Sequence, residues 1–181
     1  MTLGGDQVVE LDFQSMHVAL AYNLCRARLN SDPYEAIPGF TRKQAKAALL
    51  TAFTSTCMRL SRRSPRPPRQ ARLCHPICAT QREAHRLLEA VKIRHTPIAR
   101  RLWSDAGMRL MNLDARIMLT AVDRLIARGI PCIPVHDSLV VPQQHEDEAR
   151  EALNFGWCTQ NPERSPCYIE KKRQKSSTIW L

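Results

Sequence analysis

Hydrophobic residues along this chain follow two different periods, which predict a small set of strands and helices. Residues 8–13, VVELDF, are mostly apolar and predict a short strand that closes with Asp12 and Phe13. Residues 17–29 then carry apolar side chains at helical spacing and predict a helix directly after the strand. Further helical patterns occupy residues 42–60, 80–95, 105–128 and 144–157.

The boundaries of these helices have recognisable signals. Thr41 is suited to cap the helix that starts at residue 42, and Gly129 is suited to end the longest one. The last helix begins with acidic residues, which favour a helix N-terminus. The apolar stripe of the longest helix is predicted to consist of Leu110, Leu113, Ile117, Val122, Leu125 and Ile126.

A β-hairpin is predicted where two β-branched runs flank a short polar segment. The runs are residues 130–135 and 139–141, and His136, Asp137 and Ser138 lie between them. Aspartate is common in turns, so a turn role alone accounts for Asp137. A charge in the middle of an apolar run is also suited to bind a ligand, and the two roles are compatible.

These elements together predict an α+β fold with an antiparallel sheet. We expect the strand at residues 8–13 to pair antiparallel with the hairpin, and helices 17–29 and 105–128 to cover one face of the sheet. Residues 171–181 are basic, and we expect this tail to be poorly ordered until it is bound.

The charge balance favours a polyanionic partner. The 181 residues include 27 Lys and Arg against 17 Asp and Glu, a formal charge of +10. A Pro-rich arm at residues 61–72 lacks the apolar residues of a core element, so it is predicted to grip nucleic-acid phosphates or to be a solubilising loop. Its arginines are Arg62, Arg63, Arg66, Arg69 and Arg72.

No apolar run approaches the length of a bilayer span, and the first residues lack the order of a signal peptide. We therefore expect a soluble, cytoplasmic protein with no membrane partner. The seven scattered cysteines favour reduced thiols over a disulfide framework. A zinc site is disfavoured, because no zinc-finger spacing is formed by the candidate ligands Cys74, Cys78, His85 and His95.

Two carboxylates and two basic residues at the start of a helix are the best candidates for catalytic or binding residues. Asp12 ends one predicted strand, Asp137 sits at the bend of another, and Arg42 and Lys46 lie in the first turns of the helix after Thr41. Nucleotidyl transfer uses two divalent metal ions held by carboxylates, with cations binding the triphosphate. A solvated helix face is the alternative for Arg42 and Lys46.

Three motifs in this order resemble the palm and fingers of A-family DNA polymerases and single-subunit phage-type RNA polymerases. LDFQSMH is similar to the first palm motif, RKQAK followed by ALLTAF to the fingers helix, and VHDSLVV to the third motif. The H-D-S form is closer to the phage RNA polymerases. The resemblance spans roughly residues 8–155, and each motif alone is short.

The resemblance implies a template-directed nucleotidyltransferase with a palm-like sheet and a small helical fingers segment. Asp12 and Asp137 would bind Mg²⁺ or Mn²⁺ and be catalytic, while Arg42, Lys46 and His17 would contact the nucleoside triphosphate. His136 would lie beside the primer or nascent strand. The partners implied are DNA or RNA, as in DNA replication, and, as one option, a separate subunit that supplies a thumb or template-binding parts.

The same resemblance divides the chain into four segments. Residues 1–40 would form the first palm segment and residues 41–104 reduced fingers that include the arm. Residues 105–157 would return to the palm, and residues 158–181 would be the basic C-terminal tail.

The sequence departs from the family pattern at several positions. His17 stands where the DNA polymerases have a glutamate that excludes a 2′-hydroxyl, so the sugar preference stays open, and a hydrogen-bonded boundary histidine is the alternative. Thr54 replaces an expected aromatic residue, with Phe53 one place early. The chain is therefore a minimal polymerase, a part of a split one, an inactive remnant or a non-catalytic nucleic-acid-binding protein; a zinc-dependent regulator is a distant alternative.

Overall fold

The computed structural model describes residues 2–3, 5–35, 37–54, 78–104, 106–161 and 167–172. The chain forms two compact units, which are described separately. Unit 1 comprises Met1–Asn23 and Met111–Leu181, and unit 2 comprises Leu24–Leu110. The arm at residues 61–72 lies outside the described residues.

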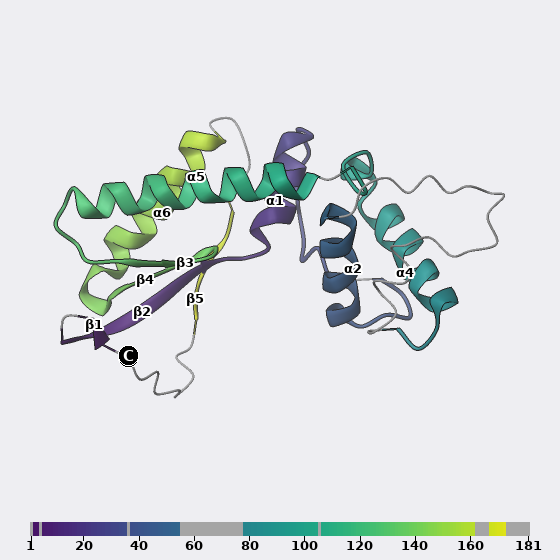
Figure 1. Cartoon of the computed structure of the whole chain (residues 1–181), viewed down its shortest axis with the longest axis horizontal. Coiled ribbons are helices and arrows are strands. Elements are labelled where there is room, and N and C mark those ends of the chain that lie inside the picture. The colour runs from purple at the N-terminus through teal and green to yellow at the C-terminus, as the bar shows by residue number, and fades with distance from the viewer. Residues whose placement is uncertain are drawn as a thin grey trace. The chain divides into compact units, whose positions relative to one another are not determined.

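Unit 1 is built on an antiparallel sheet with β2 (Asp6–Phe13) at its centre (Figure 1). On one side β2 pairs with β4 (Ser138–Pro142), which pairs in turn with β3 (Ile133–Val135). β2 also pairs with β1 (Thr2–Leu3) and β5 (Ile169–Lys172). The α+β class and the antiparallel pairing of residues 8–13 with the hairpin are thus confirmed.

The hairpin turn consists of two residues, His136 and Asp137, because Val135 and Ser138 are already paired. His136 adopts a φ of 54°, a left-handed conformation that suits a tight hairpin turn. The first arm is shorter than predicted, since β3 begins at Ile133 rather than at residue 130. Asp137 therefore does have the turn role that its position in the sequence suggested.

Helix α6 (Glu146–Gln160) contacts both β2 and β4. The sequence analysis did not predict that this helix would pack on the sheet. Leu11 and Phe13 of β2 are fully buried, and the Phe13 ring lies 5.7 Å from the Trp157 ring of α6. α5 (Ala106–Ile126) packs closely on α6, because a Cβ at Gly156 would lie 2.5 Å from the Ile117 carbonyl oxygen. Figure 1 shows α5 and α6 on one side of the strands.

Two helical predictions in this unit need correction. α1 spans Met16–Leu24 and stops before the predicted end at residue 29. Ile126, which was assigned to the buried stripe of α5, is 63% exposed, whereas Leu110, Ile117 and Leu125 are buried as predicted. Ile126 follows the fully buried Leu125 and lies about 100° further around the helix, outside the buried stripe.

Unit 2 contains α2 (Arg42–Thr54), α4 (Gln81–Arg94) and the short 3₁₀ helix η2 (Thr96–Ile98). Thr41 caps α2 as predicted, since its hydroxyl accepts a hydrogen bond from the Gln44 N–H while the Gln44 side chain accepts from the Thr41 N–H. The Thr80 hydroxyl caps α4 by accepting from the Glu83 N–H, while the Glu83 side chain accepts from the Ala79 N–H. α2 and α4 contact each other. Both helices carry fully buried apolar residues, among them Leu49, Phe53, Leu87 and Leu88.

Candidate active site at the end of the central strand

Asp12, near the end of β2, lies close to Asp137 in the turn that joins β3 to β4. Asp12 on β2 is paired with Ser138 on β4, and Asp137 immediately precedes Ser138. The Phe13 N–H donates a 3.1 Å hydrogen bond to the Asp137 carbonyl oxygen, which ties the turn to the end of β2. The two residues, 125 positions apart in the sequence, therefore belong to one local site.

Strand alternation places this site on the face of the sheet that α6 does not cover. Side chains point to alternate faces, so Asp12 and Glu10 project opposite to the buried Leu11 and Phe13. The Ser138 hydroxyl donates a 2.8 Å hydrogen bond to Glu10 Oε1, as expected for neighbours on one face. One face of β2 therefore carries the carboxylates Glu10 and Asp12. The opposite face is apolar and anchors the strand through Leu11 and Phe13.

Asp12 is held in a position that disfavours its charge. Its side chain is only 15% exposed, and burial together with the negative charge of Asp137 raises its pKa above the ordinary value. Glu170 on β5, the direct cross-strand neighbour of Asp12, adds to this effect. Asp12 Oδ1 is buried and has no hydrogen-bond partner among the described residues, so it can accept a ligand.

Lys172 of β5 supplies the positive charge of the site. Its Nζ donates to Glu10 Oε1 at 2.8 Å and lies 3.3 Å from Asp12 Oδ2. Burial alone would lower the pKa of Lys172, but Glu10 and Asp12 together raise it. Burial alone would also raise the pKa of Glu10, yet the bonds from Lys172 and Ser138 bring it below the ordinary value.

Cys167 shares the electrostatic surroundings of the two aspartates. Its thiol donates to the Gln14 carbonyl oxygen at 3.3 Å, and burial, with the negative charges of Asp137 and Asp12, raises its pKa to about 12. The thiol is thus protonated at neutral pH and is a poor nucleophile.

Glu10, Glu170 and Lys172 were not predicted as site residues. Glu10 could have been found from the strand period, because it lies two positions before Asp12 and therefore on the same face. Glu170 and Lys172 lie on β5, a strand that the sequence analysis did not predict; Lys171 and Lys172 fall within the tail that was expected to be poorly ordered. Charged residues in a basic segment carry no clear strand signal.

The donor chemistry of Asp12 and Asp137 fits a hard divalent cation. Magnesium commonly binds one or two carboxylates and completes its coordination with water and substrate phosphates. The buried, unpartnered Asp12 Oδ1 is a suitable ligand atom. In the described ranges, no group of three or more His, Cys, Asp or Glu residues is arranged to hold a metal ion, so phosphate and water would have to complete such a site.

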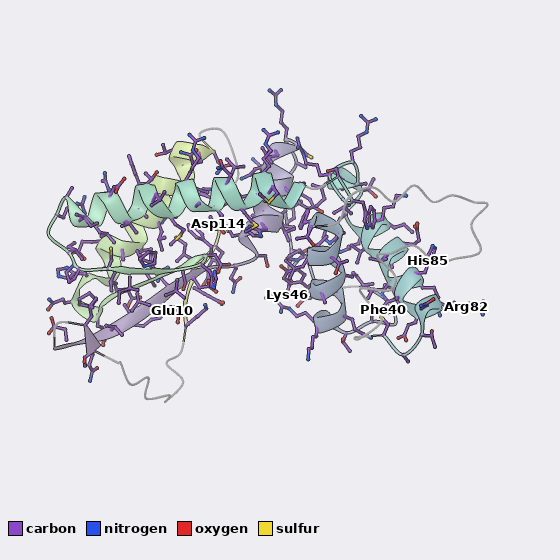
Figure 2. All side chains as sticks on the ribbon, viewed as in Figure 1. Glu10, Phe40, Lys46, Arg82, His85 and Asp114 are labelled. Carbon is purple, nitrogen blue, oxygen red and sulfur yellow. The ribbon has the colours of Figure 1, made fainter. Side chains whose placement is uncertain are left out.

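The two histidines predicted to contact substrate have different surroundings. His17 Nε2 lies 3.1 Å from Asp114 Oδ2 of α5, and the other Asp114 oxygen is buried without a partner in the described part of the chain. His136 is exposed at the hairpin turn, adjacent to Asp137. Figure 2 shows Asp114 on α5 and Glu10 on β2.

The predicted triphosphate contacts, Arg42 and Lys46, belong to unit 2. Arg42 Nε donates a 2.7 Å hydrogen bond to Asp32 Oδ2, and its guanidinium carbon lies 5.1 Å from the Tyr34 ring centroid. Lys46 is exposed, with Nζ 5.9 Å from the same ring. Arg42 is therefore already paired within unit 2, whereas Lys46 forms no ion pair with any described residue.

A hollow of about 550 Å³ lies in unit 2 between α4 and the loop before α2. Apolar side chains from both segments line it, and Arg86, Arg94 and His85 add polar groups. Figure 2 labels two of the lining residues, Phe40 and His85. Glu89 also lines it, and its Oε1 is buried without a partner in the part of the chain that the structure describes. The apolar lining residues are Ile37, Pro38, Phe40, Ala90 and Ile93.

The disfavoured zinc ligands include Cys74, which lies outside the described residues. Cys78 and His95 are buried, and the ring of His95 bonds to the Pro33 carbonyl oxygen at 3.0 Å. Burial lowers the pKa of His95 and favours its neutral form. His85 instead lines the hollow beside α4.

Comparison with known proteins returns neither a matching family model nor a matching curated protein. The structure itself defines an α+β protein with an antiparallel sheet, in which Asp12 of the central strand lies near Asp137 of the hairpin turn. None of the described helices has the length and apolar character needed to cross a bilayer.

Proposed function

We propose that this chain is a reduced, palm-type nucleotidyltransferase that extends a nucleic-acid strand on a template. The observation that carries the proposal is the proximity of two carboxylates, Asp12 on β2 and Asp137 in the hairpin turn next to Ser138, the strand partner of Asp12. The order of the three sequence motifs and the +10 charge support the same function.

In this reaction the 3′-hydroxyl of the growing strand attacks the α-phosphorus of a nucleoside triphosphate. A new P–O bond forms, pyrophosphate leaves and the hydroxyl proton is lost to solvent. Mg²⁺ or Mn²⁺ would activate the hydroxyl and neutralise the leaving pyrophosphate. Asp12 and Asp137 would hold the metal, and the exposed His136 would lie beside the strand end.

Cationic and polar residues outside the carboxylate pair would bind the nucleotide. Lys46, exposed at the start of α2, is suited to a triphosphate, and Arg42 could join it after leaving Asp32. His17, held by Asp114, would face the sugar. The arginine arm would bind phosphates of the template or product without selecting bases.

Primer extension with the full chain tests this function. Ribonucleotides and deoxyribonucleotides are supplied separately with Mg²⁺ or Mn²⁺ and a primed template. Extension should be lost in Asp137→Asn, because an amide keeps the turn but binds Mg²⁺ poorly. Asp147→Asn, an exposed aspartate of α6 outside the carboxylate pair, is the matched control and should retain activity. Absence of extension with both metals and all nucleotides would contradict the proposal.

A second candidate function, non-catalytic binding of single-stranded nucleic acid, is favoured by the hollow in unit 2. Phe40 offers a ring for stacking, Glu89 offers an unpartnered acceptor for a base N–H, and Arg86 offers a cation for phosphate. Fluorescence anisotropy with labelled oligonucleotides should show weaker binding for Phe40→Ala than for Phe155→Ala, an exposed aromatic control on α6. Equal binding by both variants would contradict this use of the hollow.

A further inference from the structure

We propose that Lys172 is an internal cation of the carboxylate site and that a divalent metal competes with it for the charge of the Asp12 carboxylate. The inference rests on the proposed metal site at Asp12 and Asp137. It adds an affinity-determining residue that lies on β5, outside the three motifs that suggested the function.

The register of the sheet places Lys172 at this site. Lys172 is the direct cross-strand partner of Glu10, and Glu170 is the partner of Asp12. Directly opposed residues project from the same face, so the Lys172 ammonium reaches both Glu10 and Asp12, at 2.8 and 3.3 Å. It therefore neutralises part of the negative charge of Glu10 and Asp12 beside Asp12 Oδ1, the atom proposed to bind the metal.

The ammonium is held firmly enough to compete with a metal but is free enough to leave. Lys172 is 41% exposed, and its flexible four-carbon stem allows it to swing toward solvent. Partly exposed ion pairs contribute little to stability, so their loss is readily offset by a metal ion. When Lys172 leaves, Glu10, Asp12, Asp137 and Glu170 keep a negative field that attracts a divalent cation.

Lys171 provides a matched control on the same strand. It is the next residue along β5, so its side chain points to the opposite face of the sheet. Its Nζ donates a 2.6 Å hydrogen bond to Glu146 Oε2 at the start of α6. Lys171→Gln and Lys172→Gln thus remove the same charge from the same strand, but only Lys172→Gln removes it from the site.

Calorimetric titration of the full chain with Mn²⁺ measures the expected difference. Lys172→Gln should bind Mn²⁺ roughly tenfold more tightly than the wild type, the ratio expected for the loss of two partly exposed ion pairs. Lys171→Gln and the charge-conserving Lys172→Arg should stay within about twofold of the wild type. Equal affinities for Lys172→Gln and the wild type would overturn the role of Lys172 while leaving the metal site intact.

A second measurement uses only the wild type and therefore does not depend on the folding of any variant. Amine-reactive labelling followed by mass spectrometry should show faster modification of Lys172 when Mn²⁺ is added, because the ammonium is released to solvent. The labelling rate of Lys171 should not change. Unchanged labelling of Lys172 at saturating Mn²⁺ would overturn the inference, and absence of Mn²⁺ binding to every chain would overturn both the inference and the proposed metal site.

Discussion

The contact between α5 and α6 offers a sharp test of the packing behind the carboxylate site. At Gly156 a Cβ would lie 2.5 Å from the Ile117 carbonyl oxygen, whereas real Cβ atoms essentially never come closer than 3.0 Å to such a neighbour. Gly156→Ala therefore requires a shift of at least 0.5 Å, the difference between 3.0 and 2.5 Å. The obstacle is backbone, which cannot rotate away as a flexible side chain would.

Two opposing effects decide the size of the change in stability. Replacing glycine by alanine inside a helix by itself stabilises by about 1 kcal/mol. Overpacking in a tightly packed interior costs about 1–3 kcal/mol, and the upper part of that range applies when backbone must move. We therefore expect Gly156→Ala to lower the free energy of unfolding by about 1–2 kcal/mol, or the melting temperature by about 2–8 °C.

Thermal unfolding followed by circular dichroism measures this effect. Asn154→Ala is the control, because residue 154 is exposed on the same helix and alanine there should be neutral or slightly stabilising. If Gly156→Ala raised the melting temperature, the close approach of α5 and α6 would be wrong. The support that α6 gives to β2 through Trp157 and Phe13 would then also need revision.

Three further predictions concern the charges of the protein. Because the pKa of Asp12 is raised, the folded state binds the proton of this carboxyl group more strongly than the unfolded state does. The resulting stabilisation of the folded state is complete below the ordinary pKa of 3.8. It is lost as the pH rises through the raised pKa. Urea unfolding should therefore show that Asp12→Asn gains stability relative to the wild type as the pH rises from about 4 to 7, and a pH-independent difference would contradict the environment described for Asp12. Thermal melts should show that Mg²⁺ stabilises the wild type more than Asp137→Asn, by up to about 2.7 kcal/mol when the metal is at a hundred times its dissociation constant, and an equal response of both proteins would reduce Asp137 to a turn residue. Deleting residues 61–72 should flatten the dependence of log affinity for nucleic acid on log salt, whereas an unchanged slope would show that the arm makes no phosphate contact.

Local patterns in the sequence predicted the elements that carry the site. The mostly apolar run at residues 8–13 predicted the strand that holds Asp12, and the β-branched runs around His136 and Asp137 predicted the hairpin. Thr41 marked the start of α2 correctly. These features depend on backbone period, capping and turn chemistry within a few residues, so they can be recognised without knowledge of the rest of the fold.

Only the tertiary structure decided which charges meet. The bonds from Lys172 to Glu10 and from His17 to Asp114 join residues 162 and 97 positions apart. Arg42, although predicted from its helix position as a phosphate contact, is paired with Asp32 in the preceding loop. Such pairs depend on which strand occupies each sheet edge and in which register, and that choice minimises the free energy of the whole chain rather than of any local segment.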